Sequence, residues 1–189
     1  MRSSGKASKL VLLDTCVVRN IIGECINLKS IFKKLLLNIG EDTEISRYVF
    51  FMFGDELQCR VLERAIEKIR KFFPSILESF AIDYVPISYS KLKNKYHEKC
   101  GKNRVRMIRR CFELGENENC NKEVDSDAFL LITACAEMND FGEVIIITHD
   151  KKAYDSLTQA VGKTKLEEKV KVYYRPAPAG VSQSEERDS

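Results

Sequence analysis

The chain has 189 residues, 44% of them apolar and 31% charged, which excludes a disordered or fibrous polymer and predicts one folded domain. Its formal charge of +3 is too small to identify a partner by itself. No apolar run approaches the roughly 20 residues that cross a bilayer, and residues 1–8 lack a signal-like stretch, so we expect a soluble protein without membrane contact, cytoplasmic or alternatively nuclear.

The N-terminal half alternates apolar strands with helical segments. Residues 9–13 are typical of a buried parallel strand, and residues 17–22 and 26–37 repeat apolar side chains at helical steps. Residues 48–53 predict a second strand. A helix follows on residues 57–73 and is stopped or kinked by Pro74.

The C-terminal half continues this alternation. Residues 82–87 resemble a short strand or extended linker, and a basic helical region follows to about residue 114. Residues 115–122 are polar and predict a loop, whereas residues 128–138 are apolar nearly all round and predict a buried helix. The remaining elements are a strand at 144–147, a helix at 151–159 and a strand at 170–174.

This order of elements predicts an α/β fold, a three-layer α/β/α sandwich around a central, mainly parallel sheet. The domain is expected to span residues 9–176, with a flexible N-terminal tail at 1–8 and a disordered C-terminal tail at 177–189. Seven cysteines form no Cys-x-x-Cys pair, which favours buried free thiols over a zinc site or a disulfide framework.

The charge is distributed unevenly along the chain. Residues 91–110 hold nine basic side chains against one acid, and residues 113–127 hold six acids against one lysine. A positive flank beside a carboxylate cluster suits a site that processes a polyanion, although a solvated helix face would give the same pattern. The candidate RNA-binding residues are Lys95, Arg104, Arg106, Arg109 and Arg110.

Four carboxylates stand where strands end or helices begin. Asp14 and Asp150 each follow a short apolar run, and ligands bind in open α/β sheets beyond the carboxyl ends of the strands. Glu56 and Asp127 stand at predicted helix starts. Carboxylates that converge would repel one another unless a cation compensates, and hard oxygen ligands favour Mg²⁺ or Mn²⁺. One metal, or two roughly 4 Å apart, could activate water against a phosphodiester.

Some assignments have a structural alternative. Asp14 could be a helix N-cap instead of a metal ligand, and Asp55 competes with Glu56 for one role. Asp125 and Asp127 compete likewise, since either could cap the following helix; Asp127 is preferred, with Asp125 as an auxiliary ligand. His149 is left without an assigned role.

The chain resembles the PIN-domain nucleases over about residues 8–176. The resemblance rests on four separated motifs whose order and spacing together are more specific than any one of them. They are residues 11–18 (VLLDTCVV), 50–57 (FFMFGDEL), 127–136 (DAFLLITACA) and 145–150 (IIITHD). Two departures are Cys16, where many members have Asn, and a longer middle segment at residues 73–123 than the smallest toxin-type members have.

The resemblance implies a Mg²⁺- or Mn²⁺-dependent endoribonuclease that cuts RNA with metal-activated water. It implies that Thr15 or Thr148 orients a ligand or water, and toxin-type relatives suggest a homodimer or a protein partner. The implied ligands, bound directly or through water, are Asp14, Glu56, Asp127 and Asp150.

Two rival functions use the same residues. A PIN-like RNA-binding or assembly scaffold would keep the fold with weak or no cleavage. A phosphatase or receiver phosphorylated on aspartate also places Asp after its first strand, but Asp14 is followed by Thr15 and Cys16 and lacks the second Asp two residues on that the phosphatase pattern needs.

Overall fold

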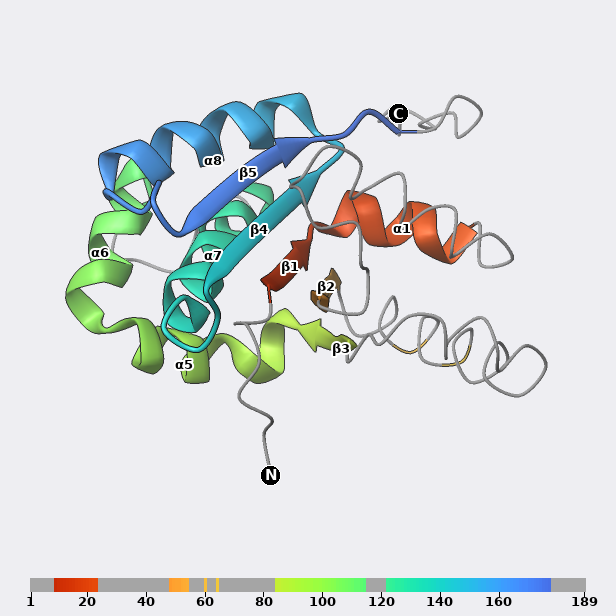
Figure 1. Ribbon diagram of the computed structural model, residues 1–189, viewed down its shortest axis with the longest axis horizontal. Coiled ribbons are helices and arrows are strands. Elements are labelled where there is room, and N and C mark those ends of the chain that lie inside the picture. Colours follow the sequence, from red (N-terminus) through yellow and green to blue (C-terminus); the bar gives the residue numbers. More distant parts are fainter. Residues whose placement is uncertain are drawn as a thin grey trace.

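The computed structural model describes residues 9–23, 48–54, 60, 64, 84–114 and 122–177 (Figure 1). Five strands form one sheet in the order β3-β2-β1-β4-β5, and every neighbouring pair is parallel. Chain connections therefore cross over between strands, as in other α/β sheets. The strands are β1 (Lys9–Leu13), β2 (Tyr48–Gly54), β3 (Tyr84–Ser88), β4 (Glu143–Thr148) and β5 (Val170–Tyr174).

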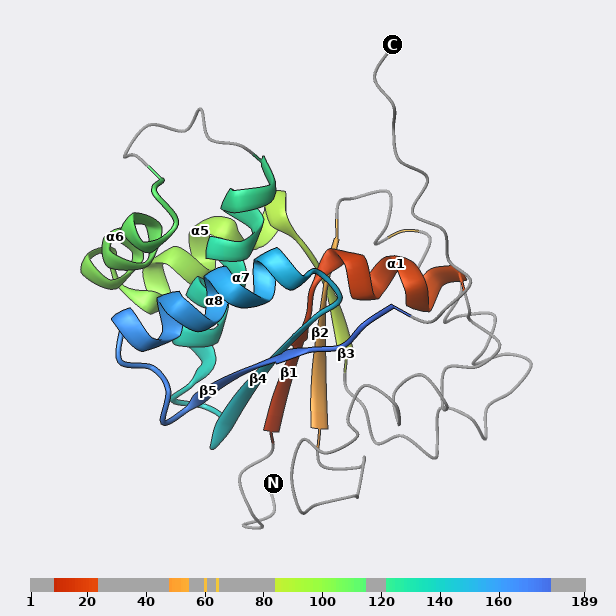
Figure 2. The same cartoon turned by 90° about the horizontal axis from the view of Figure 1, so that it is seen from above.

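Helices flank this sheet. Figures 1 and 2 set α1 on one side of the sheet and the other four labelled helices together on the opposite side. The helices are α1 (Thr15–Gly23), α5 (Tyr89–Cys100), α6 (Lys102–Cys111), α7 (Lys122–Glu137) and α8 (Lys151–Lys163). The predicted α/β class with a parallel sheet and flanking helices is confirmed. Among the described residues, no helix combines the length and the apolar character that crossing a membrane requires.

The side chains of β1 alternate between the two faces of the sheet and are buried on both. Leu10 and Leu12 belong to the large apolar cluster that includes residues of α5, α6, α7 and α8. Val11 and Leu13 are equally buried but lie outside that cluster, because successive strand side chains point to opposite faces. Burial of each such leucine contributes about 1.5–3 kcal/mol, so β1 is anchored from both sides.

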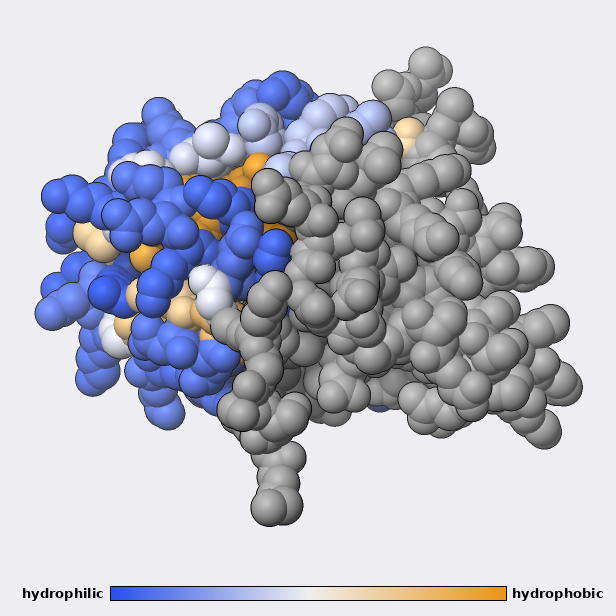
Figure 3. Space-filling view, in the orientation of Figure 1, coloured by the Kyte–Doolittle hydropathy of each residue, from blue (hydrophilic) through white to orange (hydrophobic). Residues whose placement is uncertain are grey.

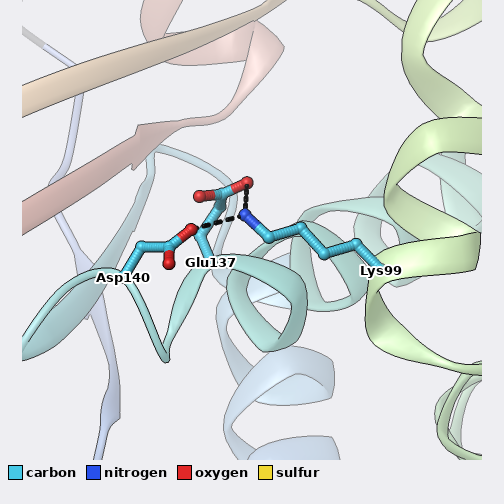
Figure 4. Close-up of polar contacts among 3 residues, drawn as sticks. All are labelled: Lys99, Glu137 and Asp140. Carbon is cyan, nitrogen blue, oxygen red and sulfur yellow. Dashed lines mark hydrogen bonds and ion pairs between the residues drawn. The ribbon is translucent and has the colours of Figure 1, made fainter.

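An ion cluster fastens α5 to the end of α7. The ammonium group of Lys99 lies 2.8 Å from Glu137 Oε1 and 2.7 Å from Asp140 Oδ2 (Figure 4). Glu137 is almost fully buried, so this lysine compensates a carboxylate that has little access to water. We refer to Lys99, Glu137 and Asp140 as the Lys99 clamp.

The predicted strands agree with the observed ones to within two residues at each end. Of the segment predicted at residues 82–87, residues 84–87 lie in β3, which is at the edge of the described sheet, and this explains why Pro86 is tolerated there. The predicted basic helical region consists of two helices, separated by Gly101 with φ 90°, a backbone conformation that favours glycine. The loop predicted at residues 115–122 overlaps α7, which begins at Lys122.

Other predictions fall partly or wholly outside the described residues. Most of the helices predicted at residues 26–37 and 57–73 do, with Arg60 and Arg64 helical where described. Both predicted tails also lie outside, except that Ala177 is described. The free thiols that are described are Cys16, Cys100, Cys111 and Cys135.

Candidate functional site

The candidate site lies at the carboxyl edge of the sheet. Because the strands are parallel, their carboxyl ends meet at one edge, and β1, β4 and β5 end side by side there. Thr148 pairs with Tyr174 in the sheet, and the backbone N–H of Asp14 donates to the carbonyl of Ile147 at 3.1 Å. Asp14, Thr148 and Tyr174 therefore form one row across three neighbouring strands.

Asp14 carries a buried carboxylate that accepts hydrogen bonds from neutral groups. Its side chain follows β1 directly, and the residue is only 4% exposed. Oδ2 accepts from Thr148 Oγ1 at 2.7 Å and from Cys16 Sγ at 3.2 Å. Oδ1 accepts from the backbone N–H of Thr15 at 2.6 Å and from its hydroxyl at 3.2 Å. These donors satisfy the polar oxygens but bring no positive charge to offset a buried anion.

Thr148 connects the two strand-end aspartates. Its hydroxyl donates to Asp14 and accepts the backbone N–H of Asp150 at 3.0 Å. The residue is fully buried, so its rotamer is fixed by packing as well as by these two bonds. Thr15 and Thr148, predicted to orient a ligand, both contact the Asp14 carboxylate.

Cys16 completes the contacts around Asp14. Its sulfur lies 3.5 Å from Thr148 Oγ1 and accepts the backbone N–H of His149 at 3.3 Å. Burial, and then the charge of Asp14, raise the pKa of the Cys16 thiol to about 12. The thiol is therefore protonated at neutral pH and acts as a donor to Asp14. Cys16 was predicted only as a departure from the family pattern, and its contact with Asp14 was not predicted.

Asp150 is the N-cap of α8. Its Oδ1 accepts the backbone N–H of Lys152 at 2.7 Å and that of Ala153 at 3.3 Å, and the residue is exposed. Capping was predicted as an alternative for Asp14 and not for Asp150. The structure thus joins Asp14 and Asp150 through Thr148, while the Asp150 carboxylate serves the helix start.

The remaining predicted acids are only partly described. Glu56 and its competitor Asp55 lie outside the described residues, and so does the side chain of Asp125. Asp127 is half-buried on α7. The prediction that Asp127 stands at a helix start is wrong, and the alternative that Asp125 or Asp127 caps this helix does not hold, because α7 begins at Lys122 and both residues lie inside it. Within the described part of the chain, no three side chains of the His, Cys, Asp and Glu types gather to hold a metal.

Aromatic and cationic side chains border the same edge and were missed by the sequence analysis. The ammonium group of Lys151 lies 4.4 Å from the ring centre of Tyr154 and 5.8 Å from that of Tyr174. The Arg175 guanidinium lies 5.4 Å from the ring centre of Tyr173. The sequence held a signal for this surface, since Tyr173, Tyr174 and Arg175 stand at the end of a predicted strand. Aromatic rings and cations together bind nucleic acid.

The His149 ring is tied to the same border. Its Nδ1 is hydrogen-bonded to the Arg175 carbonyl, and the Arg175 backbone N–H donates to the Thr148 carbonyl at 2.9 Å. Burial lowers the pKa of His149, although the Arg175 carbonyl and the charge of Asp14 act in the opposite direction. A neutral imidazole held by the backbone has a structural use here, so His149 receives no catalytic role.

The predicted RNA-binding residues lie elsewhere. Arg104 Nη1 is 3.8 Å from Cys135 Sγ, and the Lys95 ammonium is 5.9 Å from the ring centre of Tyr96. The other three, Arg106, Arg109 and Arg110, line a hollow beside α6. Figures 1 and 2 show α6 beside α7 and α8 and well away from the start of α1. Arg106, Arg109 and Arg110 therefore lie away from Asp14, which directly precedes α1.

We compared the chain with protein-family descriptions, with curated proteins and with solved structures, and none of them matches it.

Proposed function

We propose that the chain is a divalent-metal-dependent endoribonuclease of the PIN type, with its site at the carboxyl edge of a three-layer α/β/α sandwich. The observation that carries the proposal is the buried carboxylate of Asp14, whose hydrogen-bond donors among the described residues are all neutral. Such a carboxylate at the ligand-binding edge of a parallel sheet gains most from a nearby cation. The motif resemblance described above supports a nuclease over other uses of that cation.

The donor chemistry fits Mg²⁺ or Mn²⁺. Carboxylate oxygens are the preferred ligands of both ions, and Asp14 and Asp150 contribute them from adjoining strand ends. In this proposal the other ligands are Asp127, with Asp125 as auxiliary, and Glu56. Bound there, the metal would supply an activated water and charge neutralisation for phosphodiester hydrolysis.

The chain's own residues have distinct tasks in this proposal. Thr148 fixes the orientation of Oδ2 of Asp14, and Thr15 fixes Oδ1. Cys16 keeps its proton, so its thiol adds no second negative charge beside Asp14. The tyrosines and cations at the end of β5 provide surfaces for the bases and phosphates of an RNA strand.

The rival scaffold function has an observation of its own. Asp150 caps α8 with the carboxylate oxygen that the nuclease would share with a metal, and a cap alone is sufficient reason for Asp at that position. A scaffold would bind RNA without turnover. Cleavage therefore decides between the two.

The test compares RNA cleavage by the wild type and by Asp14→Asn in Mg²⁺ and in Mn²⁺. Loss of a group that merely orients a metal ligand costs about 10–100-fold, so removal of the ligand charge should cost about 100-fold or more. Glu167→Gln is the matched control, because it removes one carboxylate from an exposed residue of no assigned role. RNA binding by Asp14→Asn should persist.

Several substrates are needed to make a negative result informative. Single-stranded RNA, hairpin RNA and single-stranded DNA are offered to the same preparations. Cleavage of RNA that disappears with Asp14→Asn and survives Glu167→Gln supports the nuclease. A wild type that binds RNA but cuts none of it in either metal supports the scaffold instead.

A further inference from the structure

Helix α6 presents a cationic groove at a distance from the candidate site. One hollow of about 700 Å³ lies along it and another of about 450 Å³ continues toward α8. The two hollows share Arg106 and Arg110, so they form one surface, which we call the α6 groove. Its cationic side chains are Lys102, Arg106, Arg109, Arg110 and Lys163.

The composition of the α6 groove favours a polyanion. Among the described residues that line it, five carry a cationic side chain and one, Glu98, carries a carboxylate. Val105 and Leu114 add apolar surface to the larger hollow, and Met107, which is 42% exposed, adds some to the smaller one. Figure 3 shows hydrophilic residues gathered over this part of the described surface, with small apolar areas between them.

The sequence of α6 explains why its cations point outward. Val105 and Ile108 are the buried positions of the helix, and they fix which face packs on the core. The basic residues of the α6 groove occupy other positions and are mostly exposed. Guanidinium groups bind phosphate through two parallel hydrogen bonds, which suits arginine better than lysine for this task.

The position of the α6 groove follows from the length of α8. Asp150 caps the first turn of this helix, and Lys163 is its last residue. At 1.5 Å per residue, the two ends are separated by roughly 20 Å. Stacked nucleotides advance by about 3.4 Å, so about six of them would span that interval. One strand could therefore occupy the α6 groove and the carboxyl edge of the sheet at once.

We infer that the α6 groove is a second RNA-binding surface, which holds the phosphate backbone of a strand whose other part lies at the Asp14 edge. The inference rests on the proposed ribonuclease function, because that function supplies RNA as the ligand. Apart from His97, the described lining contains no ring on which a base could stack. The α6 groove therefore binds RNA with little regard to base sequence and favours long substrates over short ones.

The test measures binding in an Asp14→Asn background without divalent metal, so that no RNA is cut. Fluorescence anisotropy compares labelled oligoadenylates of about 16 and about 4 nucleotides, one longer and one shorter than the interval. In this background, Arg106→Gln/Arg110→Gln should weaken binding of the long RNA by about tenfold and leave the short RNA unchanged. Because two fewer phosphates would be neutralised, the slope of log affinity against log salt should fall by about 1.4.

Two further variants test whether the loss of RNA binding is specific to the α6 groove or follows from any loss of positive charge or from misfolding. Arg110→Gln/Lys163→Gln removes cations from two different helices of the groove and should have the same effect. Lys169→Gln/Lys171→Gln removes two positive charges from exposed residues that line neither hollow, and it should change nothing. Far-ultraviolet circular dichroism and thermal melting verify that each variant is folded.

The outcomes distinguish this inference from the proposed nuclease. If the protein shows the length-dependent binding but cuts no RNA, the inference about the α6 groove stands and the proposed nuclease is refuted. A chain that cuts RNA, yet binds both oligonucleotides equally or loses as much affinity in the lysine control, overturns the α6 groove. Polyglutamate that competes as well as RNA of equal charge would overturn RNA as its ligand.

Discussion

The contacts of single residues decide what the carboxyl edge of the sheet can do. Thr148 donates to Asp14 and accepts from the backbone of Asp150, so one hydroxyl sets the geometry of both strand ends. Cys16 approaches the same carboxylate oxygen from α1. A cation that binds Asp14 would find the carboxylate already oriented, which lowers the entropic cost of ligation.

Replacing Thr148 by valine tests this orientation. Valine has nearly the same shape but leaves the buried Asp14 carboxylate and the Asp150 N–H each with one partner fewer, so the free energy of unfolding should fall by about 1–3 kcal/mol. The apparent Mn²⁺ affinity for cleavage should fall by about 10–100-fold. Urea denaturation and metal titration measure the two effects.

Thr148→Ser is the matched control, since it keeps the hydroxyl and removes only a buried methyl group. It should cost about 0.5–1.5 kcal/mol and retain most of the metal affinity. Equal losses of metal affinity in the serine and valine variants would contradict the orienting role.

Tyr96 gives the stability of the protein a defined pH dependence. Burial, and then the charge of Glu137, raise its pKa from 10 to about 12, while Lys99 acts in the opposite direction. Between these pH values the unfolded chain loses the phenolic proton and the folded chain retains it. The free energy of unfolding therefore decreases as pH rises from 10 to about 12, and the contribution of Tyr96 is complete below pH 10.

The measured quantity is the difference in stability between wild type and Tyr96→Phe. Phenylalanine keeps the edge-to-face contact with Phe129, whose ring centre is 6.1 Å away, and removes the titrating group. Urea denaturation at several alkaline pH values should show the wild type losing stability relative to the variant. Parallel pH profiles of the two proteins would refute the assignment.

At this scale the sequence could predict which residues meet but not how they bond. Asp14 and Thr148 follow apolar runs that had to be parallel strands, so their proximity was predictable. The N-cap role of Asp150 was open to prediction, because Asp preceding a helix is a common cap. The thiol contact of Cys16 was not, since it depends on the side-chain rotamer at the first turn of α1.

Between elements, the Lys99 clamp should contribute more to the free energy of unfolding than an ion pair on the surface does. Lys99 on α5 holds Glu137, which ends α7, and the carboxylate is nearly buried. The pair between Lys151 and Asp155 lies within one exposed helix, and its two side chains are 59% and 61% exposed. Burial, and not the number of ion pairs, should set the cost of breaking each one.

Lys99→Met should therefore lower the free energy of unfolding by about 1–3 kcal/mol, because Glu137 is left without its cation. Asp155→Asn breaks the exposed pair and should cost about 0.5 kcal/mol or less. Urea denaturation of both variants provides the comparison. Lys99→Met/Glu137→Gln should recover part of the loss, and equal costs for the two single variants would refute the role of burial.

Element boundaries were predicted less well than element types, for local reasons. The basic region after β3 has helical propensity throughout, and only the positive φ of Gly101 reveals that α5 and α6 are separate. α7 begins at Lys122, the last residue of the segment predicted to be a loop. Its first two residues, a lysine and a glutamate, are good helix formers, although their polar character favoured the loop prediction. The long-range position of α6 relative to Asp14 had no signal in the sequence at all.

For the whole molecule, the parallel sheet was predictable from the sequence, whereas the arrangement of the helices was much less so. Short apolar runs separated by helices identify parallel strands, and β1 flanked by β2 and β4 places Asp14 in the middle of the edge. Which helix faces carry the cations depends on how α5, α6, α7 and α8 pack together. The sequence thus identified the positive charge of residues 91–110 but not the surface of the molecule on which these side chains lie.

The strand order also governs when the candidate site can exist. β1 is made before its partner β4, and the hydroxyl that holds Asp14 comes from the end of β4, which spans residues 143–148. A nascent chain has Asp14 outside the ribosome long before that strand emerges. Such a chain carries the aspartate without its hydrogen-bond geometry, so the carboxyl edge of the sheet is assembled only after β4 has been made.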